Sequence, residues 1–124
     1  MCVAGARRAQ LELEKHKDTD LRVLVVWFEM YEGDDRATWR AALLNDPRAV
    51  HYWDESKAVG RWFAGRGGAF RKSGPVFWDA WLLYETGARA KKNLDKPLAW
   101  GRTIVATEKG LAEALERLAA PGNR

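Results

Sequence analysis

The sequence predicts an α/β domain with a mixed sheet, and three observations lead to this prediction. Segments with a helical spacing of apolar residues alternate with short, nearly continuous apolar runs that are typical of buried strands. The 124 residues are enough for one hydrophobic core, and 47% of them are hydrophobic. The chain shows no internal repeat, so we expect a single domain over residues 1–124.

The first part of the chain predicts a helix followed by a buried strand. Residues 2–17 place Val3, Ala6 and Leu13 on one face, which is the spacing of an amphipathic helix. The run LRVLVVWFE, residues 21–29, is apolar with almost no alternation. Strands buried on both faces have this composition, and they occur in α/β sheets that helices cover on either side.

A second helix and a short strand are expected next. Asp34 or Asp35 is positioned to cap a helix over about residues 36–44, because a carboxylate at the N-cap accepts backbone N–H groups. Pro47 marks the end of this helix, since the residue before a proline avoids the α region. Residues 49–53, AVHYW, are predicted to form a short strand or an extended stretch.

The middle of the chain predicts a third helix and then a long loop. Asp54 is expected to cap the helix, with Val59, Trp62 and Phe63 facing inward. Residues 65–75, GRGGAFRKSGP, contain four glycines and one proline, and this density of glycine is typical of a loop.

The last part of the chain predicts a β-hairpin and a closing helix. Residues 76–85 and 98–107 are apolar runs joined by about a dozen polar residues, and we expect them to pair antiparallel. Thr107 is expected to cap the last helix, whose apolar residues recur with helical spacing. That stripe comprises Leu111, Ala114, Leu115, Leu118 and Ala119. The expected core between sheet and terminal helices contains Trp27, Trp78, Trp81, Leu83 and Leu115.

Composition argues against several classes of protein. A single cysteine cannot form an intramolecular disulfide, and Cys2 with two separated histidines does not supply a zinc cluster, so we expect no metal and no cofactor. No apolar run reaches about 18 residues and no signal segment opens the sequence, so we expect a cytoplasmic protein without a membrane partner. The net charge of +4 allows attraction to anions but predicts no specific nucleic-acid partner.

Several segments resemble the thioredoxin-like fold, and more narrowly a group of bacterial thioredoxin-like proteins. These segments are VLVVW, DPRAVHYWD and WDAWLLY, together with the predicted hairpin and closing helix. The resemblance implies a three-layer fold with a helix that begins at a reactive cysteine pair and with a cis proline before the hairpin. This sequence departs from that pattern, because Cys2 is a lone cysteine and the strand leading into the helix is absent. In the fold that strand lies inside the sheet.

Cys2 is the candidate catalytic residue. A helix N-terminus lowers the pKa of a thiol, and Arg7 and Arg8, one to two turns further on, act in the same direction. A lone thiolate attacks a disulfide but cannot resolve the mixed disulfide within the chain, so a monothiol cycle with glutathione is the redox option. The alternative is that Cys2 is an unreactive terminal residue.

Two further groups of residues are candidates for ligand binding. Asp34 and Asp35 follow the carboxyl end of the first long strand, where open α/β sheets bind ligands, and paired carboxylates can hold a divalent cation. The alternative is one capping residue and a solvated neighbour. Arg66, Arg71 and Lys72 lie in the glycine-rich segment, where they can hold an anion. The segment does not fit a phosphate-binding loop, because Arg71 occupies the position of the required glycine.

These observations leave two functions open. The first is a thiol-disulfide oxidoreductase-like protein with Cys2 as its redox centre and a protein thiol or disulfide as substrate. The second is a non-catalytic interaction module that binds a protein or an anionic partner through its sheet edge or its basic segment. Without a neighbouring strand, residues 21–29 are expected either to pair with residues 76–85 or to be completed by a second copy in a homodimer.

Overall fold

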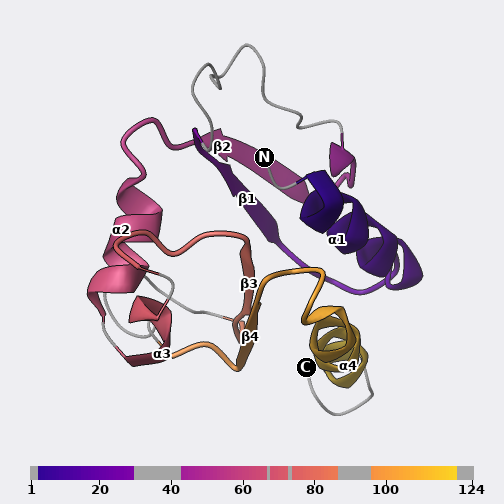
Figure 1. Ribbon diagram of the computed structural model, residues 1–124. Coiled ribbons are helices and arrows are strands. Elements are labelled where there is room, and N and C mark those ends of the chain that lie inside the picture. The colour runs from indigo at the N-terminus through magenta and orange to yellow at the C-terminus, as the bar shows by residue number, and fades with distance from the viewer. Residues whose placement is uncertain (1–2, 30–42, 67, 73, 87–95, 120–124) are drawn as a thin grey trace.

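The computed structural model describes residues 3–29, 43–66, 68–72, 74–86 and 96–119, and in this part the chain is a mixed α/β structure (Figure 1). The α/β prediction is therefore confirmed. Helices α1 and α4 lie on one side of the molecule and α2 and α3 on the other, with the strands between them. The elements are α1 Val3–Lys15, β1 Val23–Trp27, β2 Ala49–Trp53, α2 Ala58–Gly65, α3 Gly68–Arg71, β3 Ala80–Leu83, β4 Ala99–Arg102 and α4 Glu108–Ala119.

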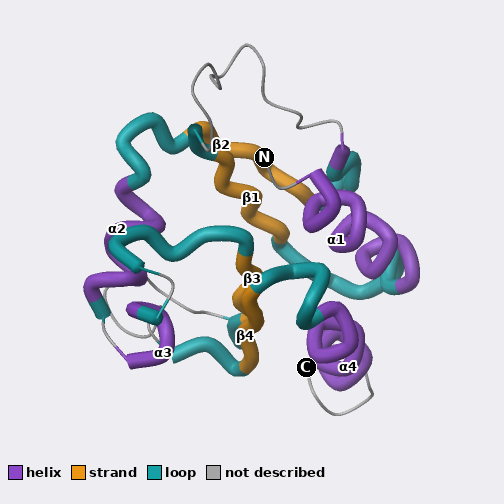
Figure 2. The backbone as a smooth tube through the Cα atoms, in the orientation of Figure 1, coloured by secondary structure: helices purple, strands orange, loops and turns teal. Residues whose placement is uncertain are grey.

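The strands form two small sheets rather than one mixed sheet (Figure 2). Strands β1 and β2 pair in parallel, with a register that runs from Val23 opposite Ala49 to Trp27 opposite Trp53. Strands β3 and β4 form the predicted antiparallel hairpin. Within the described residues no backbone ladder joins β1 to β3, so the expected pairing of residues 21–29 with residues 76–85 is not observed.

The hairpin strands are shorter than predicted because the segments before β3 and after β4 bond elsewhere. The N–H of Phe77 donates to the carbonyl of Gly60 in α2, which ties residues 76–77 to that helix. Asp79 has a φ of 49°, so the backbone turns before β3 begins. After β4 the N–H of Thr107 donates to the carbonyl of Thr103, and this turn leads into α4. The Gly74–Pro75 peptide bond is trans.

The prediction of a long loop over residues 65–75 is wrong in its central part. Residues Gly68–Arg71 form the short helix α3, and Phe70 is buried in the core. Counting glycines misled the prediction, because burial of one aromatic side chain offsets the local flexibility of its glycine neighbours. Helix α3 consequently has a defined position against α2.

An aromatic cluster forms the core beneath α2 and α3. The ring centroids of Phe63, Phe70 and Phe77 lie 5.2–5.8 Å apart, in tilted and edge-to-face arrangements. The Trp100 ring of β4 lies 4.8 Å from Phe70 and 5.6 Å from Phe77. The hairpin and the two helices therefore share one hydrophobic core, and they hold each other in place.

The predicted core residues are buried to different degrees. Trp27 and Leu115 are buried as expected, whereas Trp78, Trp81 and Leu83 are half-buried. The Trp81 indole donates to the hydroxyl of Thr107 at 2.9 Å, and the Trp78 ring faces the Arg102 guanidinium at 4.9 Å. Both tryptophans therefore keep a polar contact near the surface. The amphipathic stripe of α4 is confirmed at its centre, where Leu111, Ala114 and Leu115 are buried.

The N-cap residue of α2 is Lys57 rather than Asp54, but the Asp54 side chain still satisfies the start of the helix from four residues before it. Its carboxylate accepts the backbone N–H groups of Ala58 and Val59 at 3.0 and 2.8 Å. The prediction that Val59 faces inward is wrong, since its side chain is 42% exposed. Of the helix predicted over residues 36–44, only residues 43 and 44 are described, and Leu44 is buried.

Candidate functional site

One face of the β1–β2 sheet exposes a patch of apolar side chains. Leu24, Val26, Val50 and Tyr52 are 59%, 37%, 47% and 51% exposed. The register places Leu24 opposite Val50 and Val26 opposite Tyr52. These two neighbouring cross-strand pairs lie on the same face of the sheet and form one contiguous patch. We call these four residues the apolar sheet face.

The opposite face of the same sheet is fixed by hydrogen bonds. The Trp27 indole donates to Nδ1 of His51 at 2.9 Å, and Nε2 of His51 lies 3.0 Å from the Leu44 carbonyl. Because the indole can only donate, Nδ1 must accept, and Nε2 carries the proton that it donates to Leu44. The face of the β1–β2 sheet that carries Trp27 and His51 is therefore engaged in contacts within the protein, whereas the apolar sheet face is exposed to solvent.

Exposed side chains of opposite charge flank β1. Arg22 precedes the strand and Glu29 follows it by two residues, and both are exposed. A strand rises about 3.3 Å per residue, so the two charges lie roughly 20 Å apart along the strand direction. By strand alternation Arg22 shares the side of Leu24 and Val26, whereas Glu29 lies two residues beyond the end of β1. A cation therefore precedes the strand and a carboxylate follows it.

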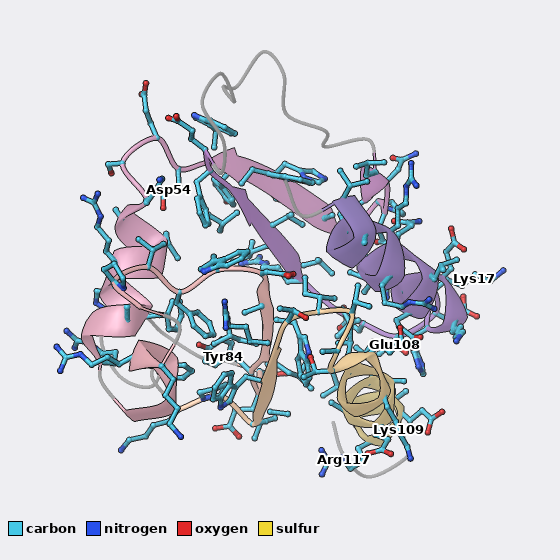
Figure 3. The ribbon with its side chains drawn as sticks, in the orientation of Figure 1. Lys17, Asp54, Tyr84, Glu108, Lys109 and Arg117 are labelled. Carbon is cyan, nitrogen blue, oxygen red and sulfur yellow. The ribbon has the colours of Figure 1, made fainter. Side chains whose placement is uncertain are left out.

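A second surface, formed by α2, α3 and their flanking residues, is strongly basic (Figure 3). Arg66, Arg71 and Lys72, the predicted anion-binding residues, are all exposed here. The Arg66 guanidinium lies over the Trp62 ring, 4.7 Å from its centroid. No acidic residue occurs between Glu55 and Asp79 in the sequence. We define the basic surface as Lys57, Arg61, Arg66, Arg71 and Lys72.

Three of the predicted site residues, Cys2, Asp34 and Asp35, lie outside the described residues. Helix α1 begins at Val3, immediately after Cys2 in the sequence. In the described ranges, no three histidine, cysteine, aspartate or glutamate side chains gather as metal ligands. The structure thus shows the three predicted cations exposed at or beside α2 and α3, and it does not test the cysteine or the acidic pair.

Comparison with protein-family models, with curated proteins and with solved structures found no match for this chain. Among the helices that the structure describes, none combines the length and the apolar character needed to span a bilayer. The apolar sheet face and the basic surface are the two features of the described residues that indicate a function.

Sequence reasoning missed the apolar sheet face and part of the basic surface. The apolar run of residues 21–29 predicted a strand covered on both faces, whereas the structure leaves one face exposed. The sequence did contain an indication for Lys57 and Arg61. No acidic residue occurs from 56 to 78, so these two cations belong to the same basic segment as the three predicted ones.

Proposed function

We propose that this chain is a non-catalytic interaction module that forms a homodimer through the apolar sheet face. The observation that carries the proposal is the exposure of Leu24, Val26, Val50 and Tyr52 as one contiguous patch. Parallel strand pairs are normally covered on both faces, and an exposed apolar patch favours association. A second copy supplies an identical patch of the same chemistry and size.

The charges beside β1 favour an antiparallel arrangement of the two copies. A two-fold axis near the centre of β1 places one apolar sheet face on the other with the strands in opposite directions. Arg22 of one copy then approaches the partner's Glu29, and the reverse pair forms at the other end. A parallel arrangement would instead bring like charges together, which disfavours it.

The size of the patch predicts a weak dimer. A stable interface of standard size uses about 20–30 residues on each side, far more than the four apolar side chains and two charges. We therefore expect a dissociation constant on the order of micromolar or weaker. Dimer formation would then depend on the concentration of the protein in solution.

The first prediction is that Val26→Lys abolishes the dimer. A lysine on each copy places two like charges in the centre of the apolar contact, where they are desolvated. Sedimentation equilibrium over about 1–200 µM should show a monomer–dimer equilibrium for the parent chain and only monomer for the variant. Val59→Lys is the matched control, because Val59 is a similarly exposed valine, 42% against 37% for Val26.

Two results would contradict the proposal. One is a parent chain that remains monomeric across this concentration range. The other is a dimer that Val59→Lys weakens as much as Val26→Lys, since that would place the contact elsewhere. A charge swap, Arg22→Glu with Glu29→Arg, should preserve the dimer, whereas Arg22→Glu alone should weaken it.

The alternative function is a thioredoxin-like redox protein with Cys2 as its reactive thiol. The helical structure of the described residues from Val3 onward supports it, because Cys2 immediately precedes this helical segment in the sequence. A thiol in that position is expected to ionise more readily than a free thiol. The resemblance also implies a helix, a long strand, a further helix, a β-hairpin and a closing helix in that order, and α1, β1, α2, the hairpin and α4 follow one another in this way, with β2 as an additional strand.

The second prediction is that Cys2 reacts with a disulfide reagent faster than free cysteine does at neutral pH. Only the thiolate attacks, so the rate should fall as the pH is lowered through the depressed pKa. The product should be a stable mixed disulfide or a cross-linked dimer, without catalytic turnover of a protein disulfide. Cys2→Ser should abolish labelling and leave the fold intact. A rate no greater than that of free cysteine would exclude the redox function.

A further inference from the structure

The basic surface is distinguished by carrying charges of one sign only. Five cationic side chains lie between residues 57 and 72, and the acidic residues nearest in sequence are Glu55 and Asp79. Four of the cations are exposed and Lys57 is half-buried. In Figure 3, side chains that end in nitrogen extend outward from α2 and α3, on the side of the molecule away from α4.

We infer that the basic surface binds the phosphate backbone of a nucleic acid without sequence preference. Arg61, Arg66 and Arg71 supply guanidinium groups, whose planar fork matches the oxygens of a phosphate. Helix α2 has eight residues and is therefore about 12 Å long. A strand of DNA carries one charge per about 3.4 Å of its axis, so the surface can contact several consecutive phosphates.

The core beneath the surface fixes the helices that carry these cations relative to each other. Phe63 of α2 and Phe70 of α3 are buried, with their ring centroids 5.7 Å apart, and this contact locks the two helices together. The backbone N–H of Arg66 donates to the carbonyl of Phe63, and its guanidinium rests on the Trp62 ring. Stacking on the indole directs one guanidinium face inward and leaves its N–H edge free to donate.

The chemistry of the surface favours phosphates over an acidic protein. A protein interface has an apolar centre with a polar rim. Between residues 57 and 72, Val59 is the only large hydrophobic residue that the structure shows as exposed, and Trp62 is half-buried under Arg66. A surface of cations without an apolar centre suits a ligand recognised through repeated negative charge. The inference does not depend on the homodimer, because the apolar sheet face shares no residue with the basic surface.

The test measures fluorescence anisotropy of labelled oligonucleotides of about 20 nucleotides with the full chain. Single-stranded DNA of two unrelated sequences should bind with similar affinity. Contacts with three to five phosphates predict that affinity falls about 15- to 130-fold when salt rises from about 50 to 200 mM. Arg71→Glu with Lys72→Glu should weaken binding at least tenfold at low salt and make the salt dependence shallower.

The matched control is Lys17→Glu with Lys109→Glu. These lysines are exposed, one after α1 and one in α4, and their reversal changes the net charge by the same amount (Figure 3). The control should bind the oligonucleotides within about threefold of the parent chain, and circular dichroism should show both variants folded. Neutral Arg71→Gln with Lys72→Gln should give an intermediate affinity.

Three results would overturn the inference. Equal loss in the two double variants would assign the binding to net charge rather than to the basic surface. Tighter binding to a labelled polyglutamate peptide, or to vesicles rich in phosphatidylserine, than to the oligonucleotides would assign the surface to an acidic protein or to a membrane. Binding that is insensitive to salt would exclude contact with the phosphate backbone.

Discussion

Phe77→Ala is expected to lower the free energy of unfolding by about 3–5 kcal/mol. The Phe77 side chain is buried, and its ring contacts those of Phe63, Phe70 and Trp100, with centroids 5.2–5.8 Å apart. Truncation removes the apolar burial of the ring and leaves a cavity at the centre of this cluster. Because α2, α3 and the hairpin meet there, the loss should affect the whole cooperative unit.

Chemical denaturation at neutral pH measures this effect. Val59→Ala is the control, since it removes apolar atoms from an exposed position of α2 and should change stability by no more than about 0.5 kcal/mol. A Phe77→Ala variant as stable as the control would show that the aromatic cluster is not the core of the folded chain.

Local periodicity predicted the elements that have one clearly apolar side or run. The strand over residues 49–53 and the stripe of α4 were predicted with nearly the observed bounds. The hairpin pairing also followed from two apolar runs with a polar connection. In these segments the local pattern and the tertiary contacts favour the same structure, so the pattern of neighbouring residues is enough to predict the helix or strand.

Tertiary contacts explain why other segments were not predicted. Phe70 makes residues 68–71 part of the core, although their glycines favour a loop. The exposure of Leu24 and Val26 depends on what packs against β1, and a single apolar run does not contain that information. The cations Arg66, Arg71 and Lys72 could be predicted from the local sequence, because their charge is a property of each residue. The apolar sheet face could not, because it depends on the register between two strands.

Arg48 connects the end of α1 to the start of β2 through five hydrogen bonds. Its guanidinium donates two bonds to the Asp46 carboxylate, at 2.8 and 2.9 Å. It also donates to the carbonyls of Leu13, His16 and Thr19, at 2.8–3.1 Å. Leu13 lies in the last turn of α1, and His16 and Thr19 follow it. The carbonyls of Leu13 and His16 also accept the backbone N–H groups of His16 and Thr19, so Arg48 is a second donor there. Side-chain exposure is 15% for Arg48 and 5% for Asp46.

Arg48→Met is therefore expected to destabilise the fold by about 3 kcal/mol. The substitution keeps the apolar stem of the side chain but removes the guanidinium from the buried Asp46 carboxylate and from the Thr19 carbonyl. The carboxylate retains the backbone N–H of residue 48, and the carbonyls of Leu13 and His16 retain their backbone donors. The estimate is at the lower end of the range for a broken buried ion pair, because Arg48 retains some contact with solvent. Arg61→Met, at an exposed position of α2, should change stability by no more than about 0.5 kcal/mol.

The pH dependence of stability provides an independent check on the same contact. The hydrogen bonds from Arg48, opposed in part by burial, hold the pKa of the Asp46 carboxyl below its usual value of 3.8. A carboxyl whose pKa is lower in the folded state stabilises the fold above the unfolded pKa, and this contribution is lost as the pH falls toward the folded pKa. The stability difference between the parent chain and Asp46→Asn should therefore be constant from about pH 7 to 5 and should shrink below about pH 4. A difference that stays constant down to about pH 3 would mean that the Asp46 charge contributes nothing to stability, and that Arg48 acts only through the three carbonyls.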